Sequence, residues 1–309
     1  MAKKSNNKYL IILFVVLAGI FAVTQLFDSG KSQRSFRSEL TSFDSSKVSA
    51  LVVYPVIENG QKLTLERNGD KWHVVRDDFR SEADLAAVNA AIPQLLNIPV
   101  KRLAATTNDR WAEFEVTDSA GTRVKILEGS KTVSDIVIGK FSVNQQMRTF
   151  TTFARVTGEE EVYAVDGFLG MTFNRDLNSW RDKTFVKFNK GDITKITVNQ
   201  SGQSLDYQKI GADWNLGGAV IDSTAMDAYL SGLALLNGAD FANGFTETTP
   251  ISTINLEGNN MQPIAVKGFT GSDGKFVFQS NLNPKAYFSS DSTGIFNNLI
   301  NALPFPETD

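Results

Sequence analysis

The sequence predicts an α+β fold made of two tandem repeats of a mostly antiparallel sheet with helices packed on one face, after one N-terminal transmembrane helix. Three observations lead to this prediction. Residues 9–27 form an uncharged apolar run. Two later segments follow the same order of turn, strand and helix signals, about 142 residues apart as measured from Trp72 to Trp214. Strand patterns joined by short hairpin turns outnumber helical patterns, and hairpins make antiparallel neighbours.

Residues 9–27, YLIILFVVLAGIFAVTQLF, have the length of a membrane span. A helix rises about 1.5 Å per residue, so this run covers roughly the 30 Å hydrocarbon core of a bilayer. A cleaved signal usually has a shorter apolar region, and Ala22-Val23-Thr24 is a poor cleavage pattern, although removal stays the alternative. The positive-inside rule, weakened by the basic residues at 31–37, places residues 1–8 in the cytoplasm and the bulk of the chain on the extracytoplasmic side of the inner membrane.

Composition excludes several classes of protein. The chain has no cysteine, which excludes a lipid-modified cysteine anchor, a disulfide framework and thiol catalysis. The formal net charge is −3 and no long basic block occurs, so we expect no nucleic-acid partner. Residues 28–46, rich in Ser and charged residues, are predicted to be a linker. The two repeats are then placed at residues 47–178 and 179–309.

Each repeat is predicted to open as a three-stranded meander, because Asn-Gly and similar turns separate alternating apolar residues. The strands of the first repeat are expected at 48–56, 62–66 and 71–74, and those of the second at 192–199, 204–207 and 213–216.

A helix is predicted next in each repeat. In the first, Ser81 with Asp84 approximates a capping box before an apolar stripe from Leu85 to Leu96, and Pro93 should kink or shorten the helix. In the second, Ser223 is the expected cap.

Both repeats then return to strands and end in a short helix. The predicted strands are 112–117, 123–127, 135–138, 149–155 and 161–165 in the first repeat, and 254–257, 263–269, 275–279 and 286–288 in the second. The closing helices are expected at 167–173 and at 295–302, the latter capped by Ser292.

The tryptophans are interpreted as core residues. Trp72 and Trp214 hold the same place after a hairpin and before a helix, where a large ring would seal the sheet against the helix. Trp111 is interpreted in the same way. Exposure of Trp111 or Trp180 would instead favour a surface that stacks on sugar rings.

The sequence predicts no catalytic, cofactor-binding or metal-binding residues, and therefore no enzyme and no cofactor. His73 is the only histidine and is expected to face solvent on its strand. The acidic clusters 77–78 and 159–161 are interpreted as solvated turns. Residues 176–180 lack the glycine of a calcium loop, and residues 271–275 are predicted to form a hairpin turn instead of a phosphate loop.

Several short motifs in a fixed order resemble a known family. They are Trp72-His73-Val74, Ala83-Asp84 with Leu95-Leu96, Ile138-Gly139, Phe153-Ala154-Arg155, Val162-Tyr163-Ala164-Val165 and Trp180-Arg181-Asp182-Lys183. In this order the chain resembles the bacterial domain of unknown function 4340 family. The resemblance implies an exported, membrane-tethered, non-enzymatic protein that accompanies ABC-type transport systems, including those linked to gliding motility. We interpret Arg181-Asp182 as a structural pair at the junction between the repeats.

Three functions are compatible with the sequence. The leading hypothesis is an accessory subunit that is held in the bilayer by residues 9–27 and docks on the permease or ATPase of an ABC-type or gliding-related complex. The alternative is a cell-envelope glycan or peptidoglycan-binding module that uses the groove between the repeats. A carboxylate-based envelope hydrolase is the third.

Overall fold

The computed structural model describes residues 14, 16–18, 37–146, 148–272 and 274–306. The predicted transmembrane helix at 9–27 therefore lies largely outside the described residues. Within this range the structure describes only Phe14 and residues 16–18, which are helical. Within the described part of the chain, no helix has both the length and the apolar character that a membrane span requires.

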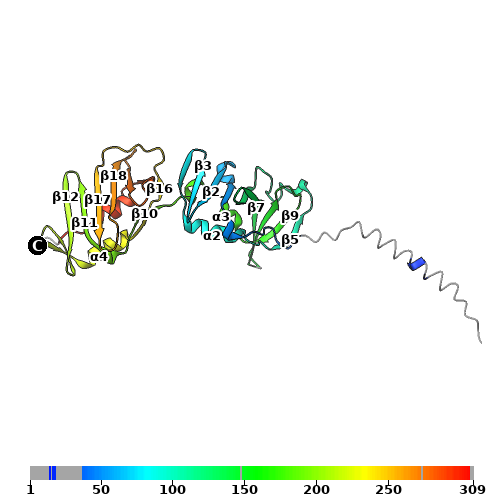
Figure 1. Ribbon diagram of the computed structural model, residues 1–309, viewed down its shortest axis with the longest axis horizontal. Coiled ribbons are helices and arrows are strands. Elements are labelled where there is room, and N and C mark those ends of the chain that lie inside the picture. Colours follow the sequence, from blue (N-terminus) through cyan, green and yellow to red (C-terminus); the bar gives the residue numbers. More distant parts are fainter. Residues whose placement is uncertain (1–13, 15, 19–36, 147, 273, 307–309) are drawn as a thin grey trace, which may run out of the picture.

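Two nine-stranded antiparallel sheets form the body, and they lie end to end along its long axis (Figure 1). The first sheet has the order β4-β3-β2-β1-β6-β7-β8-β9-β5 and the second has the order β14-β13-β12-β11-β17-β18-β19-β20-β16. The strand order is the same in both halves. The prediction of a mostly antiparallel, sheet-rich fold with two large sheets and few helices is thus confirmed.

The strands of the first half are β1 Ala50–Tyr54, β2 Leu63–Asn68, β3 Lys71–Arg76, β4 Phe79–Glu82, β5 Val100–Ala105, β6 Thr122–Glu128, β7 Lys131–Asn144, β8 Thr149–Val156 and β9 Val162–Asp166. Those of the second half are β11 Ile193–Gln200, β12 Gln203–Ile210, β13 Asp213–Leu216, β14 Ala219–Ile221, β16 Asp240–Phe241, β17 Ser252–Gly258, β18 Ile264–Thr270, β19 Phe276–Ser280 and β20 Tyr287–Ser290. A separate pair joins β10 Thr184–Lys187 to β15 Leu235–Asn237.

Each meander has four strands instead of the predicted three, because β4 and β14 continue it. The turns before them use left-handed backbone, with Asp77 at φ 48° and the Gly217-Gly218 pair at φ 59° and 92°. Two-residue hairpin turns that match the twist of the strands need such positive φ values. Asp77-Asp78 and Gly217-Gly218 are therefore the turn residues of two further hairpins.

The predicted helices are present, but their caps are aspartates. Helix α2 spans Leu85–Leu95 and α4 spans Ser223–Leu233. Asp84 accepts a hydrogen bond from the Ala87 amide at 3.0 Å, and Asp222 accepts one from the Ala225 amide at 2.8 Å. Ser81 lies in β4 and Ser223 is already helical, so the predicted serine caps are wrong. Pro93 sits in the last turn of α2, which ends two residues later, as expected for a residue without an amide hydrogen.

The closing helices have no side-chain cap. Helix α3 covers Leu169–Phe173, close to the predicted range. In the second half a helical turn covers Asn297–Asn301, and Asp291 accepts bonds from the amides of Thr293 and Gly294. The predicted Ser292 cap is therefore wrong, because Asp291 closes the turn that precedes the helix and the helix itself has no side-chain cap.

Residues 112–117, predicted as a strand, form a loop that lies on the outer face of the first sheet. The loop reverses at Glu115, whose φ is 55°, and Lys140 donates its amide to the carbonyl of Phe114 at 3.0 Å. Gly139 makes this approach possible, since a Cβ there would overlap the Phe114 carbonyl oxygen. The first half consequently has a small second core, formed by Ala105, Phe114, Val116, Val137, Phe153, Val162 and Ala164.

The main core of each half lies between the sheet and its helices. Trp72 and Trp214 are each 6% exposed and belong to these two cores, which confirms their predicted role.

The end of the predicted linker is packed against the first half. Glu39 bridges to Pro99, and both Leu40 and Thr41 are buried. Thr41 donates its hydroxyl hydrogen to the carbonyl of Leu95 at the end of α2. The same place in the second half is taken by the β10–β15 pair. Residues 38–41 are therefore part of the folded unit.

Candidate functional site

The two halves are joined by a short segment that passes from α3 to β10. A single 3-10 turn, Leu177–Trp180, begins this segment, and Asp176 caps the turn by accepting the Ser179 amide at 2.8 Å. Asp176 therefore serves as a cap in a stretch whose sequence starts like a calcium loop. Trp180 is fully buried in the first core, and its backbone carbonyl accepts the amide of Asp84.

Arg181 is the central residue of the junction. It is 3% exposed, and its guanidinium lies 4.9 Å from the ring centroid of Phe79 in the first half and 3.4 Å from that of Phe241 in the second. Its Nη1 atom donates to Asn178 at 3.0 Å and to Asn243 at 2.7 Å. Burial lowers the pKa of Arg181 to about 10 because the charged form loses hydration.

Arg181 and Asp182 both make structural contacts at the junction, as the sequence indicated, but their side chains do not pair with each other. Among the described residues no carboxylate lies within salt-bridge distance of the guanidinium, and two asparagine oxygens and two aromatic rings take that role. Asp182 points its side chain back to its own chain, where it accepts the Thr184 amide at 2.9 Å. Its carbonyl accepts a bond from the Asn283 side chain at 3.0 Å.

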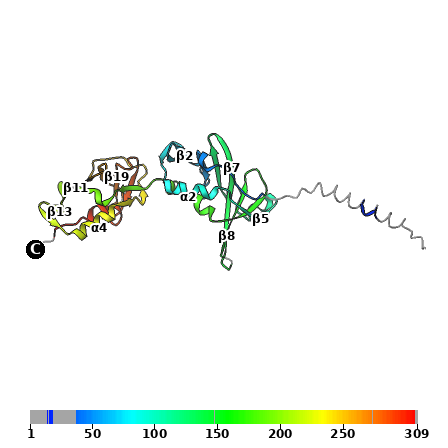
Figure 2. The same cartoon turned by 60° about the horizontal axis from the view of Figure 1, so that its bottom comes forward.

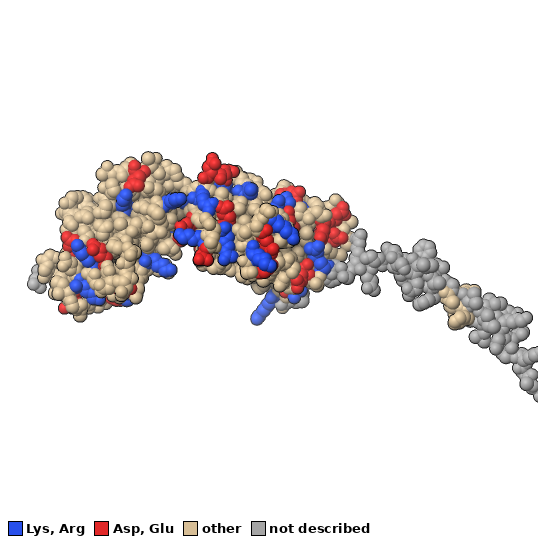
Figure 3. Space-filling model, viewed as in Figure 1, with Lys and Arg blue, Asp and Glu red and all other residues tan. Residues whose placement is uncertain are grey.

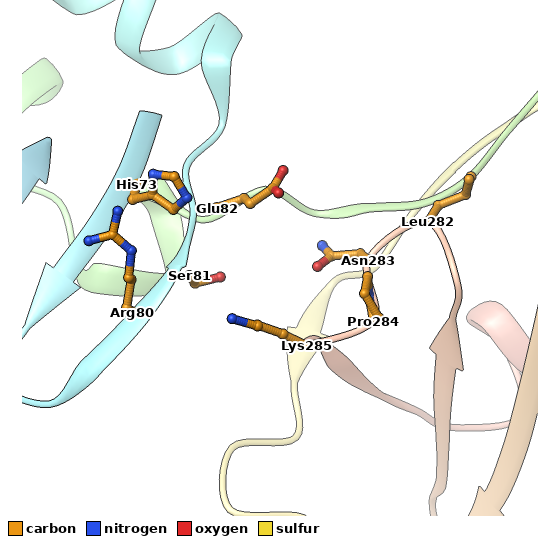
Figure 4. A pocket seen from close by; sticks show the side chains of 8 residues that line it. All are labelled: His73, Arg80, Ser81, Glu82, Leu282, Asn283, Pro284 and Lys285. Atoms are coloured by element: carbon orange, nitrogen blue, oxygen red, sulfur yellow. The ribbon is translucent and has the colours of Figure 1, made fainter. Parts of the chain in front are cut away.

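A cleft of about 130 Å³ opens beside this junction, between β4 and the loop that connects β19 to β20. We call it the junction cleft. The first half contributes one wall and the second half the other, and Lys285 reaches across the gap toward Ser81 (Figure 4). Its lining residues are His73, Arg80, Ser81, Glu82, Leu282, Asn283, Pro284 and Lys285.

His73 lines this cleft, so its predicted exposure to solvent is only partly right. The residue is half-buried, and its Nδ1 atom is buried without a hydrogen-bond partner among the described residues. The sequence shows that His73 is the only histidine, but it does not place His73 in a cleft. The other wall of the cleft comes from a loop more than 200 positions further along the chain.

The acidic clusters do not come together. Asp77 and Asp78 are exposed in the β3–β4 turn, whereas Glu159 forms an ion pair with Arg37 at the opposite part of the first half. In the described part of the chain no group of three or more His, Cys, Asp or Glu side chains is arranged to hold a metal ion.

The described residues 271, 272, 274 and 275 lie in the predicted hairpin turn between β18 and β19. The amide of Gly271 donates to the carbonyl of Lys275 at 2.9 Å, which closes the turn.

A buried arginine fixes the loop on the outer face of the first sheet. Arg155 is 2% exposed and donates from Nε to the carbonyl of Val116 at 2.6 Å. Its guanidinium stacks 4.0 Å from the centroid of Trp111, whose Nε1 donates to the Glu160 carbonyl at 2.8 Å. Trp111 is therefore half-buried, with Arg155 over one face of its ring and its Nε1 hydrogen used inside the protein. Two motifs of the family resemblance, Ile138-Gly139 and Phe153-Ala154-Arg155, meet at this loop.

Three phenylalanines are exposed together on the first half, where the β7–β8 hairpin projects from the body (Figure 2). Phe141 and Phe150 are 39% exposed and Phe168 is 36% exposed, and their ring centroids are 4.3 to 6.5 Å apart. Val143, opposite Phe150 in the ladder, and Met171 of α3 are exposed as well. We call these five residues the aromatic patch. Contiguous exposed apolar surface of this kind often marks an interaction site.

Charges of both signs are mixed on one face of the body. Lys and Arg side chains alternate with Asp and Glu on the face shown in Figure 3, and many of them are paired, as in Lys71–Glu82 at 2.7 Å. This face has no large area of one sign.

These features define a class of protein: a duplicated antiparallel α+β body whose halves are locked by a buried arginine and flank a polar cleft. The chain belongs to the family described as Domain of unknown function (DUF4340), whose profile matches residues 74–257. The matched region runs from β3 to β17, and so includes the junction and the loop held by Arg155. No curated protein and no solved structure matches the chain.

Proposed function

We propose that this protein is a single-pass accessory subunit of a membrane complex. In this proposal residues 9–27 span the cytoplasmic membrane, residues 1–8 face the cytoplasm, and the duplicated body docks on the extracytoplasmic side of an ABC-type or gliding-related assembly. The partner would be the permease or, through it, the ATPase. The body has a recognition role and no catalytic role.

The observation that carries the docking proposal is the aromatic patch. Each of its phenylalanines leaves more than a third of its surface in water, and apolar surface costs roughly 25 cal/mol per Å² while it stays hydrated. A hairpin that presents stacked rings away from the body offers a rigid anchor, and aromatic residues are enriched at the centres of protein interfaces.

The place of the patch along the chain also supports this proposal. Residues 28–36 separate the proposed span from Arg37, and a fully extended segment of that length reaches at most about 30 Å. Residues 38–41 then pack into the first half, which contains the patch. Tethering would keep the patch near other proteins of the same membrane and raise its effective concentration there.

A photo-crosslinking experiment tests the docking surface. A benzophenone amino acid placed at Phe150 should form adducts in intact membranes with a multi-span permease or with its nucleotide-hydrolysing subunit. Ile210, an exposed apolar residue of β12 in the second half, is the matched control position. Absence of any adduct from position 150, or the same adducts from both positions, would contradict the proposed docking surface.

Membrane extraction tests the anchor separately. The full-length protein should stay in the pellet after alkaline carbonate treatment, and its N-terminal sequence should begin before residue 9. Recovery of a soluble protein that lacks the first thirty or so residues would show that the apolar segment is a removed signal.

A further inference from the structure

We propose that the junction cleft is a binding site for a small oxyanion, a carboxylate or a phosphate, held between the two halves by Lys285, Ser81 and His73. The inference goes beyond the proposed docking function and does not depend on it, because the cleft and the aromatic patch are formed by different residues.

The charges of the cleft leave one cation without a counterion. On the wall formed by the first half, Lys71 pairs with Glu82 at 2.7 Å and Arg80 pairs with Glu66. On the opposite wall, Lys285 makes neither a hydrogen bond nor an ion pair with any residue that the structure describes. The two pairs cancel, so the cleft carries the uncompensated charge of the Lys285 ammonium. An anionic ligand would neutralise this charge.

Two further polar side chains that line the cleft have an atom without a hydrogen-bond partner among the described residues. Ser81 is 6% exposed, and within the described residues its hydroxyl has no hydrogen-bond partner, although it points into the cleft (Figure 4). The Nδ1 atom of His73 is buried and equally unpartnered among these residues. Most buried polar side-chain atoms in folded proteins have a partner, since losing hydration without one is costly. A hydroxyl and an imidazole nitrogen can both donate to an oxyanion.

The size of the cleft fits a small ligand. Its volume is about 130 Å³, whereas one water molecule takes roughly 30 Å³ of liquid volume. A phosphate ion or a short mono- or dicarboxylate fits this space, whereas an oligosaccharide does not. Asn283, which also lines the cleft, is occupied in a bond to the Asp182 carbonyl and so fixes the wall on which Lys285 stands.

Because the chain has a single histidine, anion binding at the cleft can be followed by the NMR signals of that residue. Full-length protein in nanodiscs, with ¹⁵N-labelled histidine, should show one set of imidazole signals, because His73 is the only histidine of the chain. Inorganic phosphate and succinate are titrated separately at constant ionic strength and pH. One of the two should shift the His73 signals with saturation, which identifies the anion class.

Two variants and a matched control locate the site. Lys285→Gln should weaken binding about tenfold or more, since it removes the charge-assisted bond. Ser81→Ala should weaken it several-fold. Lys209→Gln removes the same charge from an exposed position on β12 and should bind as the unmodified protein does.

Three results would each overturn the proposal. They are no saturable shift with either anion, a shift of the same size in all variants, and saturable binding that Lys285→Gln does not change. Lys285 is exposed, so its replacement is not expected to unfold the protein.

Discussion

The guanidinium of Arg181 lies 3.4 Å from the ring centroid of Phe241, and this contact connects the two halves of the molecule. Arg181 follows directly after a residue of the first core, whereas Phe241 is on β16, the edge strand of the second sheet. A buried cation normally requires a carboxylate. Here aromatic faces and asparagine oxygens replace it, which fits the pKa of about 10 that burial imposes on Arg181.

Arg181 and Phe241 are therefore predicted to be energetically coupled. In a double-mutant cycle of Arg181→Met and Phe241→Leu, measured by urea unfolding, we expect a coupling energy of about 0.5–2 kcal/mol. Phe114→Leu, in the small core on the outer face of the first sheet, is the control partner and should be additive with Arg181→Met. Additivity of both pairs would show that the ring contact contributes nothing.

Gly139 is predicted to be intolerant of any side chain. Its Cβ would overlap the Phe114 carbonyl and crowd Val116, so Gly139→Ala should destabilise the first half by about 1–3 kcal/mol or more. Gly170 in α3 is the matched control, because the nearest atom to its added Cβ is 4.0 Å away. Gly170→Ala should be neutral or slightly stabilising in the same unfolding measurement. Equal effects at the two positions would mean that the loop is not held close to β7.

Asp222, and not the neighbouring Ser223, is predicted to stabilise the start of α4. Asp222→Ala should cost about 0.5–2 kcal/mol, since it leaves an amide of the first turn without its acceptor. Ser223→Ala should change the free energy of unfolding by less than about 0.5 kcal/mol, because Ser223 is already a helical residue. The reverse ranking in thermal or urea unfolding would restore the serine as the cap.

Asp135 is predicted to contribute stability that depends on pH. Burial pushes the pKa of its carboxyl upward, but hydrogen bonds from Arg123 at 2.7 and 2.8 Å and from Thr157 at 2.8 Å outweigh burial and hold it below the usual value. A carboxyl with a lowered pKa in the folded state stabilises the fold above its unfolded pKa of about 3.9, and this contribution disappears as pH falls through the folded value.

Asp135→Asn should accordingly be less stable than the unmodified protein by about 1–3 kcal/mol near pH 7, the range for hydrogen bonds to a charged group. The difference between the two proteins should shrink as pH falls below about 4. Comparing the two at each pH cancels the other carboxylates. A difference that stays constant down to pH 2 would show that Asp135 titrates normally.

The sequence predicted the position of Arg181 at the junction, but neither its partners nor the aromatic patch. Arg181 was placed correctly at the boundary, because it follows the last signals of the first repeat. Its partners were not, since Phe241 and Asn243 follow it by about 60 positions and no local pattern brings them together. The exposure of Phe141 and Phe150 was not predicted either, since a phenylalanine on a strand usually indicates a buried face. Phe168, which completes the group, lies just before α3.

Local sequence was sufficient for the repeated order of strands and helices, because alternation, hairpin turns and apolar stripes act between residues a few positions apart. It misjudged the loop at 112–117, where β-like residues are held in a loop by Gly139 and Arg155 from distant strands. The cleft arose only when β4 of one half met the β19–β20 loop of the other. Contacts between such distant segments depend on how whole sheets pack, and this packing places Lys285, Ser81 and His73 around one space.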